Sequence, residues 1–306
     1  MKSENWSTKD IPSLKGKTII VTGGNSGLGY ESVKAFAEKG AQVIMTCRNI
    51  EKGEKARNLI TQDIKDAKIV VMQLDLMDMA SIHKFAGEFK QTHKNLHVLL
   101  NNAGIMMVPY QITKDGIESQ QATNHFGHYV LTALLLETLK NTPGSRVVNV
   151  SSMAHRSGDM NFDNLLYEGG KDYTPMKAYG RSKLENLLFT YELQRYFESN
   201  KIDSIAVAAH PGVSDTNLFS HMGGKFLQKL LKPLFSIFIQ PSAMGALPQL
   251  RAAVDEQVKG GEYYGPDGRN EMKGYPVVVS SNKASNDKQN ARKLWEISAK
   301  ITGVNF

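Results

Sequence analysis

The chain has 306 residues, of which 41% are hydrophobic and 22% are charged. Both fractions are typical of globular proteins, which excludes a largely disordered chain. Cys47 is the single cysteine, so an intramolecular disulfide is excluded and a cysteine-based metal site has no support. Carboxylates and histidines do not cluster at ligand spacing either, and we predict no metal site.

The formal net charge of +7 raises the question of nucleic-acid binding. The lysines and arginines are spread along the chain without a basic tract, however, and a positive field suits an anionic dinucleotide equally well. The N-terminal residues contain no apolar run like the core of a signal peptide, and no apolar stretch reaches the roughly 18 residues of a spanning helix. We therefore expect a cytoplasmic protein with no nucleic-acid partner and no transmembrane segment.

Short apolar runs alternate with helical stretches along most of the chain. Strands are predicted at Lys17–Val21, Gln42–Thr46, Lys68–Leu74, His97–Leu100, Arg146–Val150 and Ser204–Ala208. Helices are predicted at Gly27–Lys39, from near Ile50, and at Ala80–Thr92, Glu118–Leu139 and Ala178–Glu198. Short strands rich in Val and Ile, separated by helices, indicate parallel βαβ units. The fold class is therefore α/β, with a doubly wound parallel sheet and helices on both faces, the Rossmann arrangement.

No linker and no internal repeat divides the chain, so we expect residues 1–306 to form one domain. Residues 1–13 are interpreted as an N-terminal extension, and residues 283–306 as a C-terminal segment with a charged surface helix. The segment from about 214 to 240 follows a different pattern, because Gly224–Ile239 mixes Leu, Phe and Lys around Pro233. A helix pair packed on the core is favoured there. A substrate lid and a peripheral membrane contact are the alternatives.

A glycine-rich loop directly follows the first predicted strand. Its residues are Thr22, Gly23, Gly24, Asn25, Ser26, Gly27, Leu28 and Gly29. Glycine lets the backbone approach a ligand closely, and a loop between a strand and a helix N-terminus presents backbone N–H groups to a pyrophosphate. A string of glycines alone is weak, because many turns contain several. The strand–loop–helix context favours dinucleotide binding over an ordinary turn.

The spacing Thr-Gly-x-x-x-Gly-x-Gly resembles the short-chain dehydrogenase/reductase family, in its classical type. Further positions agree with that family's pattern at the ends of later predicted strands, where open α/β sheets bind ligands. The resemblance implies that the cofactor contacts Gly23, Asn25, Ser26, Gly27, Leu28, Gly29, Asp75, Leu76, Asn102, Ala103, Gly104, Pro211, Gly212 and Thr216. The sequence Asn101-Asn102-Ala103-Gly104, which follows the fourth predicted strand, could also be an ordinary turn at the end of a strand.

The residues at the end of the second predicted strand indicate whether NAD or NADP is the preferred cofactor. An acid at this point would bind the ribose hydroxyls of NAD, whereas a nearby arginine accommodates the 2′-phosphate of NADP. The sequence has Arg48 and no acid here, and Asn25 can add a polar contact. The alternative is that Arg48 only pairs with a neighbouring helix, for example with Glu51. We favour NADP(H) over NAD(H).

Tyr179 and Lys183 lie four residues apart in a predicted helix, which places both side chains on one face. A neighbouring ammonium favours the phenolate, so we expect Lys183 to lower the pKa of Tyr179. Tyr179 could then donate a proton to a carbonyl or accept one from an alcohol. Tyr-x-x-x-Lys is weak alone, but it follows the glycine loop and the Asn-Asn-Ala-Gly turn in the family's order. The resemblance therefore implies that Tyr179 and Lys183 are catalytic and also contact the cofactor.

Ser151 and Ser152 end the fifth predicted strand, where a hydroxyl could stabilise the substrate oxygen. The resemblance favours Ser152 as that catalytic residue. It also implies that Asn124 supports a proton relay through Lys183 and water, although a helix asparagine can equally well bond to backbone. His125 and His128 are interpreted as structural or surface residues.

The long segment Met153–Ala178 separates Ser152 from Tyr179. Together with the residues around Arg48, Asn124 and Lys183, it resembles the branch that holds retinol dehydrogenases, WW-domain oxidoreductases and protochlorophyllide reductases. This resemblance implies a lipophilic aldehyde, ketone or retinol-like alcohol as substrate.

Two other functions are kept as alternatives. One is a non-catalytic NADP(H)-binding sensor, and the other is a light-dependent reductase of the protochlorophyllide type.

A homodimer through the two long helices Glu118–Leu139 and Ala178–Glu198 is also considered, although the sheet could bury their apolar faces instead.

Overall fold

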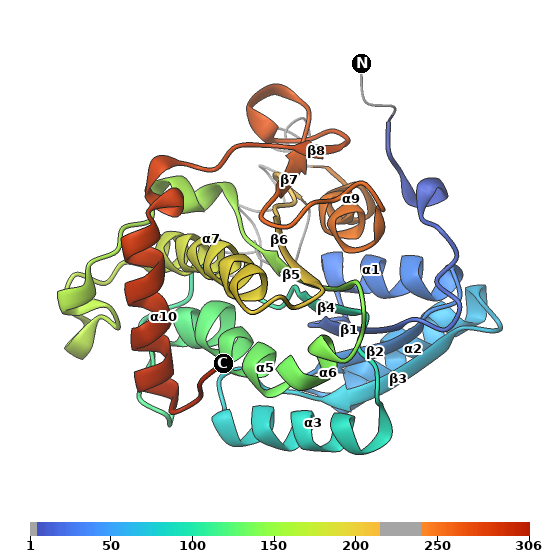
Figure 1. Cartoon of the computed structure of the whole chain (residues 1–306), viewed down its shortest axis with the longest axis horizontal. Helices are drawn as coiled ribbons and strands as arrows, with labels where there is room; N and C mark the ends of the chain where they lie inside the picture. Colours follow the sequence, from blue (N-terminus) through green and yellow to red (C-terminus); the bar gives the residue numbers. More distant parts are fainter. Residues whose placement is uncertain (1–4, 215–239) are drawn as a thin grey trace, which may run out of the picture.

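The computed structural model describes residues 5–214 and 240–306, and the statements below refer to these ranges. They contain an eight-stranded sheet in the order β3-β2-β1-β4-β5-β6-β7-β8 (Figure 1). Neighbouring strands are parallel except β8, which is antiparallel to β7. The strands are β1 (Thr18–Thr22), β2 (Gln42–Cys47), β3 (Lys68–Gln73), β4 (Val98–Asn101), β5 (Ser145–Val150), β6 (Ser204–Ala209), β7 (Tyr263–Pro266) and β8 (Pro276–Val278). The predicted α/β fold with a doubly wound sheet is confirmed, and the first six strands lie where they were predicted.

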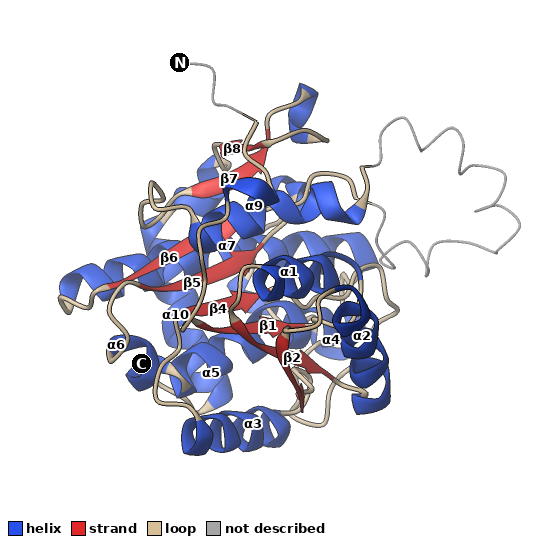
Figure 2. Ribbon diagram, turned by 90° about the vertical axis from the view of Figure 1, so that its right-hand side faces the viewer, coloured by secondary structure: helices blue, strands red, loops and turns tan. Residues whose placement is uncertain are grey.

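The central strands are buried on both faces because helices cover each side of the sheet (Figure 2). Side chains alternate along a strand, so Ile19 and Val21 of β1 enter one apolar core, and Ile20 enters another. The first core includes side chains of α1 (Gly27–Glu38), α2 (Ile50–Asp63) and α9 (Ser242–Val254). The second includes side chains of α3 (Met79–Thr92), α5 (Gly127–Leu134), α6 (Leu136–Lys140) and α7 (Pro175–Ser199).

The segment predicted as one helix, Glu118–Leu139, is helical but not one regular α-helix. The chain instead forms α4 (Ser119–Gln121), a π-helical turn at Ala122–Phe126, α5 and α6. The Glu118 carboxylate caps the first turn by accepting the N–H groups of Gln120 and Gln121 at 2.9 and 3.0 Å. Within the π turn, the Asn124 side chain bonds to the backbone of Ile105 outside the helix. Such turns often mark functional sites.

The C-terminal segment is more than the charged surface helix that was predicted. After a short 3₁₀ turn at Lys283–Asn286, α10 (Lys288–Thr302) packs against α7 (Figure 1). Trp295 packs on the rings of Tyr129 and Tyr196, with centroids 5.7 Å away in both pairs. The faces of α5 and α7 that contact α10 are therefore covered within the chain itself.

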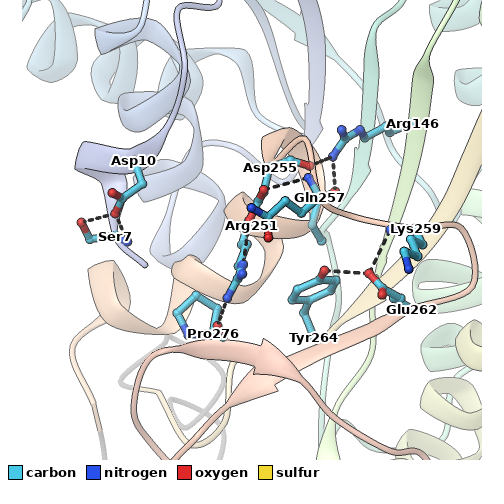
Figure 3. A network of polar contacts seen from close by, with 11 residues as sticks. Ser7, Asp10, Arg146, Arg251, Asp255, Gln257, Lys259, Glu262, Tyr264 and Pro276 are labelled. Carbon is cyan, nitrogen blue, oxygen red and sulfur yellow. Dashed lines mark hydrogen bonds and ion pairs between the residues drawn. The ribbon is translucent and has the colours of Figure 1, made fainter. Parts of the chain in front are cut away.

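The strands β7 and β8 were not predicted, and polar contacts hold them against α9 (Figure 3). The Arg251 guanidinium donates to the carboxylate of Asp255 at 2.9 Å and to the backbone carbonyl of Pro276 at 2.6 Å. Arg146 of β5 donates to the carbonyls of Ala252 and Asp255 at 3.2 and 2.8 Å. These bonds join the end of the sheet to its centre. The strands are too short, and too rich in Gly and Pro, for their periodicity to reveal them.

The segment from about 214 to 240, with its helix-pair, lid and membrane alternatives, lies outside the described residues except for its two ends. Those ends are joined, because Ser214 and Gln240 form a parallel bridge. In the described ranges, no helix is both long and apolar enough to cross a membrane.

Candidate active site

A cavity of about 720 Å³ opens at the carboxyl ends of the central strands. Of the predicted cofactor residues, all that the structure describes line it: Gly23, Asn25, Ser26, Gly27, Leu28, Gly29, Arg48, Asp75, Leu76, Asn102, Ala103, Gly104, Tyr179, Lys183, Pro211 and Gly212. Ser152 also lines it, whereas Asn124 lies behind the wall, and Thr216 lies outside the described residues. Residues from seven separate segments of the sequence, which were predicted to form one site, therefore line a single cavity.

The glycine loop is shaped for an anionic ligand. A Cβ atom on Gly29 would lie 2.3 Å from the carbonyl oxygen of Gly23, so only glycine fits there. Gly23 and Gly27 have positive φ angles of 64° and 52°, which glycine adopts without strain. Ser26 precedes α1 without a side-chain cap, whereas the side chains of Asn49, Asp78 and Thr174 cap α2, α3 and α7. The first amides of α1 are left for a ligand, as a pyrophosphate would require.

Two cations lie at the far end of the cavity, beyond β2. Arg48 is exposed, and Lys52 in the first turn of α2 joins it in the cavity wall. The alternative pairing of Arg48 with Glu51 is wrong, because Glu51 pairs with Lys55 at 2.8 Å. Lys52 was missed in the sequence, where nothing within the predicted helix sets it apart from the other charged residues.

The turn after β4 is fixed by the last residue of β1. The Thr22 hydroxyl oxygen accepts the N–H groups of Asn102 and Ala103, both at 2.9 Å. The Asn102 side chain donates to the Thr22 carbonyl at 2.8 Å. A Cβ on Gly104 would lie 3.2 Å from Asn124 Oδ1 and 3.4 Å from Lys183 Nζ. The glycine therefore leaves room for polar groups that meet at the base of the cavity.

Tyr179 and Lys183 project from the first turns of α7 into the cavity, and both are buried. Lys183 Nζ lies 5.7 Å from the centroid of the Tyr179 ring and donates to the carbonyl of Val150 at 3.0 Å. Burial raises the pKa of Tyr179, and a hydrogen bond with Ser152 lowers it by less. Burial also lowers the pKa of Lys183 to about 8.

The prediction that Lys183 lowers the pKa of Tyr179 is therefore wrong in its net direction. The ammonium donates to the Val150 carbonyl, and the shift in the pKa of Tyr179 comes from burial, which raises it, and from the Ser152 hydrogen bond, which lowers it by less. The arrangement keeps the Tyr179 hydroxyl protonated, which suits a proton donor.

The two serines at the end of β5 have different surroundings. Ser151 donates to the backbone carbonyl of Lys183 at 2.8 Å, which commits its hydroxyl to α7. Ser152 caps the following 3₁₀ turn by accepting the N–H of Ala154 at 3.2 Å and lies within hydrogen-bonding reach of Tyr179. This geometry agrees with the choice of Ser152 over Ser151.

The Asn124 side chain is fully committed. Its Oδ1 accepts the N–H of Ile105 at 2.9 Å, and its Nδ2 donates to the carbonyl of Ile105 at 3.0 Å and to Ser182 Oγ at 2.8 Å. Ser182 in turn donates to the carbonyl of Tyr179 at 2.8 Å. Asn124 thereby joins the turn after β4 to the helix that carries Tyr179. Because its side chain is occupied, only its main-chain groups could take part in the predicted proton relay through Lys183.

The loop after β6 is held by three residues that sequence reasoning missed. Gly212 has a φ of 65° and donates its N–H to His210 Nδ1 at 3.2 Å. His210 Nε2 bonds to Glu271 at 2.9 Å, and Arg156 bonds to the same carboxylate at 2.8 Å. Burial lowers the pKa of His210, which favours the neutral ring. No local pattern could reveal this cluster, since its members come from distant parts of the chain.

Part of the cavity lining is an apolar wall. Its residues are Ile105, Met106, Met107, Met153, Met176 and Val213. Methionine is flexible and polarizable and adapts to irregular apolar ligands. The consecutive methionines after the Asn-Asn-Ala-Gly turn were a signal of this wall that the sequence predictions left unused.

The long segment before Tyr179 is anchored to α7 by Arg181. This buried guanidinium donates to Asp159 at 2.7 Å and to the carbonyls of Asn164 and Leu165, both at 2.8 Å. It also lies 4.2 Å from the centroid of the Tyr167 ring.

The described residues contain no group of three or more His, Cys, Asp or Glu side chains that could hold a metal ion.

Comparisons with known proteins agree with this site. Residues 17–223 match the family model "short chain dehydrogenase". The chain is 39% identical to retinol dehydrogenase 12 of Mus musculus over 295 residues, covering 96% of this chain and 88% of that protein. It is 40% identical to retinol dehydrogenase 11 of Homo sapiens over 293 residues, covering 95% and 87%.

Solved structures show the same fold. An uncharacterised protein from Mycobacterium paratuberculosis has a TM-score of 0.83 and 38% identity, with 99% of each chain covered. A short-chain dehydrogenase from Shigella flexneri, solved with NADP, has a TM-score of 0.64 at 20% identity, covering 83% of this chain and 98% of that one. With its glycine loop, its tyrosine–lysine pair and these matches, the chain belongs to the short-chain dehydrogenase/reductase family of NAD(P)-dependent oxidoreductases that act on CH–OH groups.

Proposed function

We propose that this protein is an NADP(H)-dependent oxidoreductase that transfers hydride between the nicotinamide and a lipophilic carbonyl compound or alcohol. One observation carries the proposal. A single cavity has Arg48 and Lys52 at one end and Tyr179, Lys183 and Ser152 at the other, with the glycine loop between them.

The residues of the site suit reduction of a carbonyl. The bound cofactor supplies the hydride. Tyr179, kept protonated by its burial, donates a proton to the carbonyl oxygen, and the Ser152 hydroxyl hydrogen-bonds to that same oxygen. The buried ammonium of Lys183 lies 5.7 Å from the centroid of the Tyr179 ring, and this positive charge favours negative charge on Tyr179 after the proton has left. The reverse sequence oxidises an alcohol.

The substrate class rests on the apolar wall formed by Met106, Met107, Met153 and Met176 together with Ile105 and Val213. Such a wall binds apolar chains or rings by burial, without polar groups that would select one head group. The names of the relatives, which are retinol dehydrogenases, point to the same class.

Cofactor preference is tested by titrating NADPH and NADH into wild type, Arg48→Ala and Lys52→Ala. Loss of a charge-assisted phosphate contact should weaken NADPH binding by about 10- to 100-fold and leave NADH binding nearly unchanged. Lys55→Ala is the control, because Lys55 lies in the same helix, pairs with Glu51 and does not line the cavity. An Arg48→Ala protein that keeps the wild-type preference for NADPH would overturn the assignment.

Turnover is tested with hydrophobic aldehydes and ketones on wild type and Tyr179→Phe. We expect wild type to oxidise NADPH with substrates of this class, and the variant to lose at least about 100-fold in kcat while it still binds NADPH. NADPH binding by wild type without turnover of any member of the panel would contradict the proposed reaction.

A further inference from the structure

His128 in α5 joins the cofactor loop to the π turn that holds Asn124. The side chain is 2% exposed, although the sequence left open whether it was structural or on the surface. Its Nε2 lies 2.9 Å from the Thr22 hydroxyl oxygen, and its Nδ1 lies 3.1 Å from the backbone carbonyl oxygen of Asn124. The ring thus spans the distance between the end of β1 and a residue of the predicted proton relay.

The hydrogen bonds of Thr22 determine which ring nitrogen carries the proton. Its hydroxyl oxygen already accepts two backbone N–H groups, those of Asn102 and Ala103. Its single hydrogen can go to His128 Nε2 at 2.9 Å or to the carbonyl of Leu100 at 3.3 Å. The shorter distance selects the ring, so Nε2 is the acceptor and the proton lies on Nδ1. Nδ1–H then donates to the Asn124 carbonyl.

The environment of the ring keeps it neutral. Burial lowers the pKa of His128 to about 3, and the charge of Lys183 acts in the same direction. A doubly protonated ring would place an N–H against a hydroxyl oxygen whose acceptor positions are occupied. One tautomer therefore satisfies every polar group in this cluster.

We propose that His128 is a positioning residue that holds the main-chain carbonyl of Asn124 in place and couples it to the cofactor-binding turn through Thr22. The side chain of Asn124 is committed to Ile105 and Ser182, so its carbonyl is the group through which it can serve a relay. The inference rests on the reaction proposed above, and on the direction of two hydrogen bonds that can be measured without any substrate.

Two matched substitutions separate the two contacts. In His128→Asn, the short amide can occupy the Nδ1 position and donate to Asn124, but it cannot reach Thr22. In His128→Gln, the longer amide can occupy the Nε2 position and accept from Thr22, but it leaves Asn124 without its donor. We expect His128→Asn to keep kcat within about threefold of wild type while NADPH binding weakens, and His128→Gln to lose at least about tenfold in kcat with NADPH binding kept within about threefold. Equal losses in both variants would mean that the ring only fills space and would overturn the proposal.

The tautomer is measured directly in wild-type protein. Long-range ¹H–¹⁵N correlation spectra distinguish Nδ1–H from Nε2–H rings, and the His128 ring signals are assigned by linking them to the sequentially assigned backbone of the wild-type protein. We expect the Nδ1–H form to persist from pH 5 to pH 8. An Nε2–H or doubly protonated ring would overturn the proposal, even if the kinetic variants could not be purified. Because this measurement needs no turnover, its failure is distinguishable from failure of the proposed reaction.

Discussion

The hydroxyl of Ser151 donates to the backbone carbonyl of Lys183 at 2.8 Å, so the strand β5 is bonded directly to the helix that carries the reactive side chains. The neighbouring Ser152 instead accepts the N–H of Ala154 at 3.2 Å and lies within hydrogen-bonding reach of Tyr179. Two adjacent serines therefore have different tasks, one in holding α7 and one in the cavity.

This difference predicts unequal effects of two alanine substitutions on kcat. Ser152→Ala should lower kcat by about 100- to 1000-fold, as loss of a hydrogen bond to a developing oxyanion does, and should lower the free energy of unfolding by about 1 kcal/mol through loss of its cap on Ala154. Ser151→Ala should lower the free energy of unfolding by about 1 kcal/mol and change kcat much less. Steady-state kinetics and thermal denaturation of both proteins test this. A larger kcat loss in Ser151→Ala than in Ser152→Ala would reverse our assignment.

The close approach at Gly29 predicts a specific loss of cofactor binding. A Cβ there would lie 2.3 Å from Gly23 O and 2.7 Å from Asn102 Nδ2, so Gly29→Ala must displace the loop. Overpacking of this kind costs about 1–3 kcal/mol, and we expect NADPH binding to weaken at least tenfold. Gly87→Ala is the control, because Gly87 lies in α3 and a Cβ added there would have no other atom within 4 Å. That substitution should stabilise the protein by about 0.5–1 kcal/mol without affecting NADPH binding, as measured by calorimetry.

The buried ammonium of Lys183 predicts a pH dependence of stability. Its pKa falls from 10.5 to about 8 on folding, so the native state loses its proton first as the pH rises. The cost of burying the cation is fully present below pH 8 and diminishes as the pH rises above it. Relative to Lys183→Met, wild type should gain about 1.5 kcal/mol between pH 8 and pH 9.5. Denaturant unfolding of both proteins across this range measures the gap, and a gap that stays constant would show that the lysine is not desolvated.

For Glu185, two residues after Lys183 in α7, we expect the opposite pH dependence, with a free energy of unfolding that falls as the pH rises. Its side chain is fully buried, Oε1 accepts from Gln121 at 2.7 Å, and Oε2 has no partner among the described residues. Burial raises its pKa from 4.5 to about 7, so its contribution to stability is lost as the pH rises through this window. Glu185→Gln should therefore be nearly neutral at pH 5 and stabilising by on the order of 2 kcal/mol at pH 8.

The control for this prediction is Glu198→Gln, which changes an exposed residue of the same helix. The difference between its free energy of unfolding and that of wild type should be the same at pH 5 and pH 8. A Glu185→Gln protein that is less stable than wild type at pH 8 would show that the ionised carboxylate has a partner in solution.

The sequence by itself determined the positions of the first six strands along the chain, the glycine loop and the tyrosine–lysine pair. These features are local: strands buried on both faces are continuous apolar runs, and residues four apart share a helix face whatever surrounds the helix. The positive φ of Gly212 is likewise a property of the backbone at that residue.

The tertiary structure alone decided the π-helical turn around Asn124, the covering of α5 and α7 by α10, and the surroundings of His128 and His210. Each depends on partners far along the chain, such as Thr22 for His128 and Glu271 for His210. The pKa of Tyr179 was decided in the same way. Sequence spacing places Lys183 near it, but the free energy of burying a phenolate depends on everything that packs around the ring, and that sum sets the direction of the shift.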